Sequence, residues 1–223
     1  MSSKPVYTLI SATPSPYARK VRIVLAEKGI PFTLQTEVPW DSDTKTPTYN
    51  PLEKLPVLIH NETDQAVYES HFILEWLEVK HPDTLSMIPR DADQRLLAKQ
   101  IEVVADGICD ALVLAIWERN RDKDKQSEPW AARQTRKING GLQALNKWVE
   151  NRPRGQQYII GETLTIADIA VCSVLGFMGV RFPEHEWKQK YPQLREFWEH
   201  LETTRDSFAS TQPKAQTYKD RIV

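Results

Sequence analysis

Short apolar runs alternate with turn-forming residues along the first part of the chain, in a pattern typical of strands. Strands are predicted over Val6–Ile10, Phe32–Glu37, Val57–His60 and Ala66–Tyr68. Between the first two runs, an amphipathic segment continues to Lys28 and stops at Gly29, as a helix would. A second amphipathic segment, Ser70–Lys80, places its apolar residues on one side. This part is therefore predicted to form a small α/β sheet domain.

The pattern changes after a proline-bounded linker, residues 81–90. From there on, apolar residues recur with a period of about 3.6, which predicts helices. These helices are expected over Ala92–Asn120, Pro129–Asn151, Ile166–Phe182 and Gln193–Thr204. We therefore divide the chain into an α/β domain, residues 1–84, and an all-helical domain, residues 85–223.

The composition is that of a globular protein: 223 residues with 40% hydrophobic content can bury a full core. The 29 basic and 30 acidic residues nearly cancel, so the charge indicates neither a nucleic-acid partner nor an anionic membrane. The longest apolar run, Ala111–Trp117, is far too short to span a bilayer. We expect a soluble, cytoplasmic protein whose partners are small or neutral molecules.

The cysteines and histidines exclude several classes of chemistry. Cys109 and Cys172 lie far apart within helical patterns and form no C-x-x-C pair, so both are interpreted as core residues. The five histidines show no metal-ligand spacing, and the chain holds no phosphate-binding glycine motif. The sequence therefore argues against metal, dinucleotide and nucleotide enzymes, and we expect no bound metal.

One polar position stands at a predicted helix start. Ser15 is a favoured N-cap residue and Pro16 a favoured first helical residue. We expect the N–H groups of Tyr17 and Ala18 to point outward beside the Ser15 hydroxyl, where an anion could bind. A thiol held there would have its pKa lowered by roughly one to two units. Taken alone, however, such a Ser-Pro pair is more often only a structural cap.

Other motifs follow Ser15-Pro16-Tyr17 in a fixed order. They are Asn50-Pro51-Leu52-Glu53-Lys54-Leu55-Pro56-Val57-Leu58, then Val67-Tyr68-Glu69-Ser70, and then Gly161-Glu162-Thr163-Leu164-Thr165-Ile166-Ala167-Asp168. In combination they resemble the cytosolic glutathione transferases over nearly the whole chain. Ser15-Pro16-Tyr17, the pair Arg19-Lys20 and the segment Ile101–Ile108 resemble most closely the YibF-type subgroup of bacteria and fungi. The resemblance implies a thioredoxin-like N-terminal domain, an all-α C-terminal domain, and glutathione as co-substrate.

The resemblance also implies roles for the residues of the first two motifs. Ser15 would stabilise the glutathione thiolate. Pro56 would be cis, although most X-Pro bonds are trans, and would turn the N–H and C=O of Val57 outward to pair with the cysteinyl part of glutathione like an added strand.

The remaining ends of the tripeptide are assigned in the same way. Glu69 would face the ammonium group, while Ser70 would cap the following helix and receive the γ-glutamyl carboxylate on its N–H. Lys54 is the expected cation for a glutathione carboxylate, and Lys45 is a weaker candidate. Without the resemblance, Ser70 would be only a cap and both lysines only solvated.

For the electrophile, the resemblance implies a pocket between loops of the first domain and early helices of the second. The candidates are Tyr17, Trp40, Asp106, Cys109 and Trp117, most of which fit a core position equally well. By contrast, Thr165 and Asp168 have the spacing of a capping box, which predicts a role in folding and not in catalysis.

The expected function is therefore transfer of glutathione to a small hydrophobic electrophile. Two alternatives stay open: a glutathione-dependent isomerase or ether-cleaving enzyme of the same fold, and a transferase-like binding or assembly module without catalysis. Relatives with cysteine at the position of Ser15 act as thiol reductases, and this chain departs from them there. The resemblance also implies a homodimer, which the near-zero net charge does not oppose.

Overall fold

A computed structural model describes residues 4–219 of the chain. The backbone contacts divide them into two compact units, one formed by residues 4–87 with 205–219 and the other by residues 88–204. Residues 205–219 thus group with the first unit, whereas the sequence analysis assigned them to the helical domain. The reason is that the short helix α9, Asp206–Ala209, packs on α1 of the first unit.

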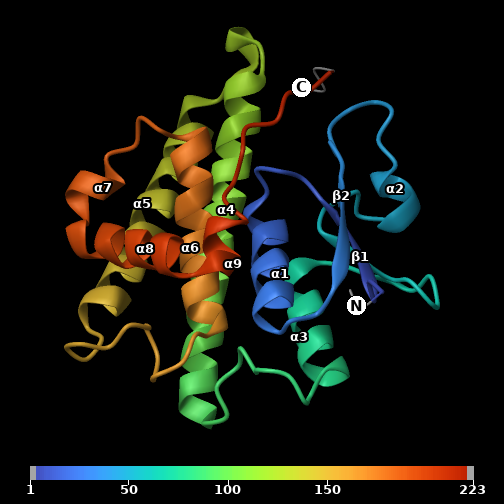
Figure 1. Cartoon of the computed structure of the whole chain (residues 1–223). Coiled ribbons are helices and arrows are strands. Elements are labelled where there is room, and N and C mark those ends of the chain that lie inside the picture. Colours follow the sequence, from blue (N-terminus) through green and yellow to red (C-terminus); the bar gives the residue numbers. More distant parts are fainter. Residues whose placement is uncertain (1–3, 220–223) are drawn as a thin grey trace. The chain divides into compact units, whose positions relative to one another are not determined.

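The first unit is built on one mixed sheet with the strand order β2-β1-β3-β4. Figure 1 labels the neighbouring strands β1 and β2. The strands are β1 Tyr7–Ser11, β2 Phe32–Thr36, β3 Val57–His60 and β4 Ala66–Val67. β1 runs parallel to β2 and antiparallel to β3, which in turn is antiparallel to β4. In this register Ile10 lies opposite Val57, and Leu58 lies opposite Val67. The end of β1, the start of β3 and the end of β4 therefore meet at one edge of the sheet.

Helices α1, Pro16–Glu27, and α3, Ser70–Lys80, pack on each other beside this sheet (Figure 1). The third helix of the region, α2, is one turn, Thr46–Tyr49. α1 ends as the sequence predicts, because Gly29 takes the left-handed backbone conformation, with φ of 64°, that glycine adopts without steric cost. The four predicted strands are all present, and no strand end differs from the prediction by more than one residue.

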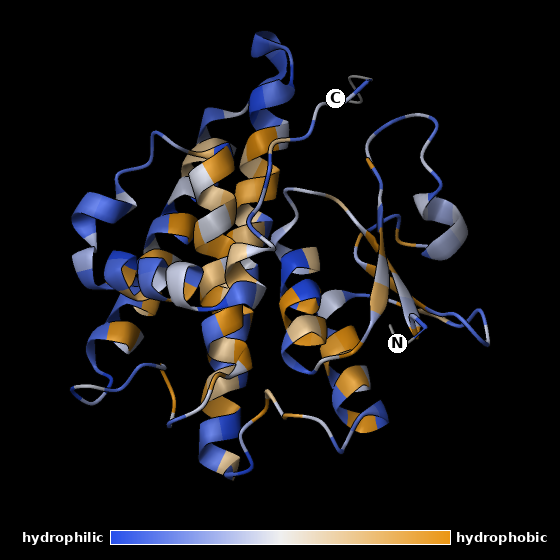
Figure 2. Cartoon of the chain, viewed as in Figure 1, coloured by the Kyte–Doolittle hydropathy of each residue, from blue (hydrophilic) through white to orange (hydrophobic). Residues whose placement is uncertain are grey.

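The second unit is entirely helical. Its elements are α4 Ala92–Asn120, the 3₁₀ turn η1 Lys123–Lys125, α5 Glu128–Glu150, α6 Ile166–Arg181, α7 Trp187–Lys190 and α8 Pro192–Thr204. α4 packs along both α5 and α6. α6 is mostly apolar (Figure 2) and is buried from Ile166 to Met178, so it forms the centre of the unit. No helix within residues 4–219 is long and apolar enough to cross a membrane.

The start of α6 confirms the predicted capping pair. Asp168 is fully buried, and one oxygen of its carboxylate accepts two hydrogen bonds from Thr165, from the N–H at 2.8 Å and from the hydroxyl at 2.9 Å. The other oxygen accepts the N–H of Ile159, at 2.8 Å, from the loop before the helix. Asp168 therefore ties that loop to the helix start. The predicted fold class, an α/β domain and an all-helical domain, is confirmed.

Candidate functional site

Three segments that are distant in sequence meet at the edge of the sheet in the first unit. Ser15 follows β1, the Leu55-Pro56 peptide precedes β3, and Glu69 follows β4. A small apolar cluster joins them: Ile10, Ala12, Leu55 and Val57 are buried together, with Tyr68 packed against them. The strand order and this cluster bring together the positions that the motifs singled out.

Ser15 is the N-cap of α1, as predicted, and is partly exposed. Its hydroxyl oxygen accepts the N–H of Ala18 at 3.2 Å, so that N–H does not point at a ligand as we expected. The N–H of Ser15 itself donates to the carbonyl of Ala12 at 3.1 Å, which closes the turn between β1 and α1. Because the oxygen is held by a backbone N–H, the hydroxyl proton is directed away from it and can donate to an anion. The first turn of α1 contains no acidic residue that would compete for the helix N-terminus.

The Leu55-Pro56 peptide is cis, as the resemblance implied. The expected role of Val57, however, is wrong. Along β3 the N–H of His60 donates toward β4 at 3.0 Å and the N–H of Asn61 donates toward β1 at 3.0 Å. Because backbone groups of a strand point alternately to its two sides, Val57 points the same way as Asn61, toward Ile10 on β1. Its N–H and C=O belong to the sheet and do not face a ligand.

The backbone of Leu55, just before the cis peptide, lies outside the ladder. Neither its N–H nor its C=O has a hydrogen-bond partner among residues 4–219. Sequence reasoning missed this residue, because the direction of backbone groups depends on the register between β1 and β3. If the register between β1 and β3 were known, counting residues along β3 would show that the backbone groups of Leu55 lie beyond the last pair of the ladder.

At the start of α3 the structure corrects another prediction. The N-cap is Glu69 and not Ser70: a carboxylate oxygen of Glu69 accepts the N–H of Phe72 at 3.0 Å. Ser70 is the first residue of the helix and is buried, with 2% of its surface exposed. Within the described chain its N–H and its hydroxyl have no hydrogen-bond partner. Two donors are thus left at the positive end of an 11-residue helix.

The two candidate lysines lie on separate parts of the first unit. Lys54 is exposed, and its carbonyl accepts the side-chain amide of Asn50 at 2.8 Å, which holds the loop before the cis peptide. Lys45 is the residue before α2, and its N–H donates to the carboxylate of Glu37 at 3.2 and 3.3 Å. Only Lys54 belongs to the loop that also carries Leu55.

The candidates for the electrophile site divide between the two units. Tyr17, in the first turn of α1, and Trp40, in the loop after β2, are partly exposed in the first unit. Asp106 and Cys109 lie on α4 of the second unit, where Asp106 is partly exposed and Cys109 is buried. Burial supports the core interpretation of Cys109, and the assignment of the other three stays a prediction.

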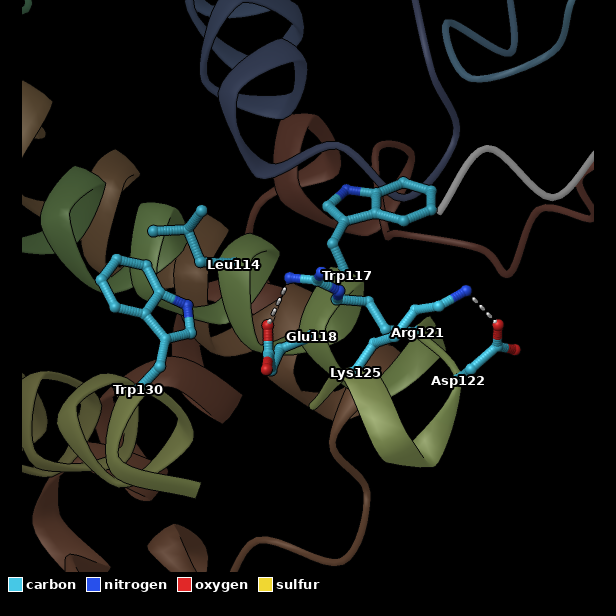
Figure 3. Close-up of a pocket in the computed structure, with 7 residues that line it drawn as sticks. All are labelled: Leu114, Trp117, Glu118, Arg121, Asp122, Lys125 and Trp130. Carbon is cyan, nitrogen blue, oxygen red and sulfur yellow. Dashed lines mark hydrogen bonds and ion pairs between the residues drawn. The ribbon is translucent and has the colours of Figure 1, made fainter. Parts of the chain in front are cut away.

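Trp117, near the end of α4, lines a recess of about 450 Å³ within the helical unit. The recess is lined by Leu114, Trp117, Glu118, Arg121, Asp122, Lys125 and Trp130 (Figure 3). The charged groups around it are engaged: Glu118 accepts the N–H of Ser127 and lies 3.8 Å from Arg121, and Lys125 binds Asp122 at 2.9 Å. The recess therefore offers mainly indole and leucine surface.

Comparison with known families decides the relationship. Residues 14–80 match the family model of the glutathione S-transferase N-terminal domain, and residues 104–204 match that of the glutathione S-transferase C-terminal domain. The chain belongs to the glutathione S-transferase family. Both domains of the family are therefore present, and the resemblance inferred from the motifs is confirmed.

Individual members of the family agree with this placement. A glutathione S-transferase from Methylobacterium radiotolerans, in complex with glutathione sulfonate, is 53% identical with a TM-score of 0.92, over 97% of this chain and 99% of that one. A glutathione S-transferase from Methylobacillus flagellatus with glutathione bound is 33% identical with a TM-score of 0.85, over 93% and 100% of the two chains. The uncharacterized GST-like protein YibF of Escherichia coli is 34% identical over 92% of this chain and 98% of its own length.

Proposed function

We propose that this member of the glutathione S-transferase family binds glutathione at the sheet edge and transfers it to a small hydrophobic electrophile, with Ser15 as the catalytic residue. The observation that carries the proposal is the Ser15 hydroxyl: it is partly exposed, and its oxygen already accepts the N–H of Ala18. Its proton is free to donate to the sulfur of glutathione. The solved relatives with glutathione or glutathione sulfonate bound support the choice of co-substrate.

The Ser15 hydroxyl acts on the thiol by favouring its charged form. A hydrogen bond to a thiolate contributes roughly 1.5–3 kcal/mol and the helix N-terminus about 0.3–1 kcal/mol, which together lower the thiol pKa by about one to three units. The thiolate then attacks the electrophilic carbon. A carbon–sulfur bond forms, and either a leaving group departs with its electron pair or a double bond or ring opens to an anion that takes a proton from water.

The other groups at the sheet edge bind the rest of the tripeptide. The N–H and hydroxyl of Ser70 take the γ-glutamyl carboxylate at the N-terminus of α3, and Glu69 faces the neighbouring ammonium with the carboxylate oxygen that does not cap the helix. The backbone of Leu55, in place of Val57, pairs with the cysteinyl part. Lys54 provides the cation for a glutathione carboxylate.

For the electrophile we propose contacts from Tyr17 and Trp40 of the first unit, and the role of Asp106 on α4 stays a prediction from the sequence. Two aromatic side chains suit an apolar substrate with a planar group. The test is a panel of electrophiles with glutathione, namely an aryl halide, an epoxide, an isothiocyanate and an enone, with conjugates identified by mass. A cis-enone and an aryl ether in the same panel report isomerisation and ether cleavage, the two alternatives within the fold. Absence of glutathione binding by titration calorimetry would leave only the non-catalytic module.

We also propose that the protein is a homodimer. Large apolar side chains lie exposed on α3 and α4, where Phe72 is 53%, Leu96 67% and Val103 56% accessible. Leu96 and Val103 are seven residues apart and share one face of α4. We expect a dimer mass in sedimentation at micromolar concentration, and a stable monomer would contradict it.

A further inference from the structure

The end of α9 and the residues that follow it lie along the first unit and are bound to it at several points. We call residues 208–219 the C-terminal strap. Its start is held by Arg19 of α1, a side chain only 1% exposed. The Arg19 guanidinium donates to the carbonyl of Phe208 at 3.1 Å and to the hydroxyl of Thr211 at 3.4 Å. A buried arginine on the helix that Ser15 begins is therefore used to bind the strap.

A second arginine on the same helix repeats the arrangement. Arg22 donates to the carbonyl of Ser210 at 3.3 Å and to the carbonyl of Thr211 at 3.5 Å. Burial, and then the charge of Arg19, lower the pKa of Arg22. Two guanidinium groups thus lie together on α1 against backbone carbonyls, so the strap is anchored on the helix itself.

The strap then reaches the turn that carries Ser15. The N–H of Lys214 donates to the carbonyl of Thr13 at 3.3 Å. The side chain of Thr13 provides no anchor of its own, because its hydroxyl oxygen is buried without a hydrogen-bond partner in the described part of the chain. The bond from Lys214 therefore adds a backbone hydrogen bond from the strap to the apolar packing of Ala12 that also holds this turn.

The far end of the strap is bound to the loop after β2. The side-chain amide of Gln216 donates to the carbonyl of Glu37 at 3.0 Å. The N–H of Lys219 donates to the carboxylate of Asp41 at 2.8 Å, and its ammonium binds Asp43 at 2.9 Å. The strap therefore links α1, the Ser15 turn and the loop that carries Trp40.

We propose that the strap holds the turn between β1 and α1 in the conformation that aims the Ser15 hydroxyl at the thiolate, with the N–H of Lys214 as the positioning group. The inference rests on the proposed function of Ser15 and adds to it. A hydrogen bond to a developing charge depends on the orientation of the donor, and a turn that is free to move loses that orientation for part of the time. Release of the strap is then expected to raise the pKa of the bound thiol without emptying the glutathione site.

The test is the variant Lys214→Pro, which removes this backbone N–H and leaves the other strap contacts in place. Ala215→Pro is the matched control, because it introduces the same ring at the next position and keeps the N–H of Lys214. The measurement is the pH profile of kcat/KM with a saturating aryl halide, together with kcat and the KM for glutathione. We expect Lys214→Pro to raise the apparent pKa of the profile by roughly 0.5–1 unit, which is a three- to tenfold loss at pH 6.5. At pH 9 its activity should approach that of the wild type, and Ala215→Pro should keep the wild-type profile.

Three results separate the possible failures. An unmoved profile in Lys214→Pro, or an equal loss of activity at every pH, overturns the role of the strap. Ser15→Ala in the same assay tests the proposed function separately: if it leaves the profile unchanged, the assignment of Ser15 fails whatever the strap does. If Lys214→Pro does not fold, Gln216→Ala removes the bond to the carbonyl of Glu37 by truncating a side chain, and it should shift the profile in the same direction by a smaller amount.

Discussion

The starts of α1 and α6 use related capping chemistry in opposite ways. At α6 the carboxylate of Asp168 is fully buried and accepts three hydrogen bonds, all from the protein itself. At α1 the Ser15 hydroxyl is partly exposed and accepts a single bond from Ala18, which leaves its proton to donate. A cap whose hydrogen bonds are all satisfied inside the protein stabilises the fold. A cap with an unused donor at the surface can also bind a ligand.

The two caps also differ in charge. Burial raises the pKa of Asp168 to about 6, although the three hydrogen bonds act in the opposite direction. The carboxylate is thus held at a cost in desolvation, which is tolerable because it joins a loop to the central helix of its unit. The start of α1 needs no such cost, because the hydroxyl of Ser15 is uncharged.

The largest effect is expected from Asp168→Ala. This change leaves two backbone N–H groups and one hydroxyl without an acceptor in a buried place, and should lower the free energy of unfolding by about 3 kcal/mol. Urea unfolding measures the loss. Activity per folded molecule should stay near that of the wild type, and a large loss of it would mean that the start of α6 also serves the site.

Ser15→Ala should show the opposite pattern, with a small loss of stability and a large loss of activity. Loss of the cap costs about 1 kcal/mol of stability, while conjugation at pH 6.5 to 7 falls roughly ten- to a hundredfold, because the thiol pKa rises. The pH profile of kcat/KM measures the shift. If the variant keeps full activity at pH 6.5, Ser15 is a cap only, and the contrast with α6 disappears.

Ser70→Ala tests the third helix start. Because Glu69 and not Ser70 caps α3, stability should change little, whereas the affinity for glutathione should fall about tenfold through loss of one hydrogen bond to a carboxylate. Titration calorimetry on this variant and on Asp168→Ala provides the comparison. Equal affinities in the two variants would remove Ser70 from the binding site.

The smallest effect is a pH dependence that belongs to α6 alone. The pKa of Asp168 is higher in the folded protein than in the unfolded chain, so its protonated form adds stability that is complete below about pH 4 and is lost as the pH rises through about 6. Asp168→Asn lacks this contribution. The stability difference between wild type and variant should therefore be larger at pH 5 than at pH 7.5, by roughly 1 kcal/mol. A stability difference that stays constant across that pH range would show that the hydrogen bonds lower the pKa of Asp168 by as much as burial raises it.

Local patterns predicted the strands, the long helices and the caps of α1 and α6 well. Val57–His60, Ser70–Lys80 and Ala92–Asn120 agree with the structure residue for residue, because alternation and helical period depend only on neighbours in the chain. The capping pair of Thr165 and Asp168 is confirmed for the same reason, since its partners lie three residues apart.

The errors fall where a backbone group takes its direction from a distant segment. Val57 faces β1 because of the register between two strands, and Leu55 was missed for the same reason. The cap of α3 was predicted one residue too late. The N-cap is Glu69 and not Ser70, because the first helical residue is set by the point at which the chain leaves β4.

The sequence by itself determined the elements, the family and the position of Ser15 at a helix start, because these depend on residue type and short spacing. The tertiary structure decided which donors remain unused and which segments meet. Strand order brought Ser15, Leu55 and Ser70 to one edge of the sheet. The hydrogen bond from the N–H of Lys214 to the carbonyl of Thr13 joins residues that lie about two hundred positions apart in the chain. No local pattern encodes such contacts, since both partners of each bond must first be placed by the fold.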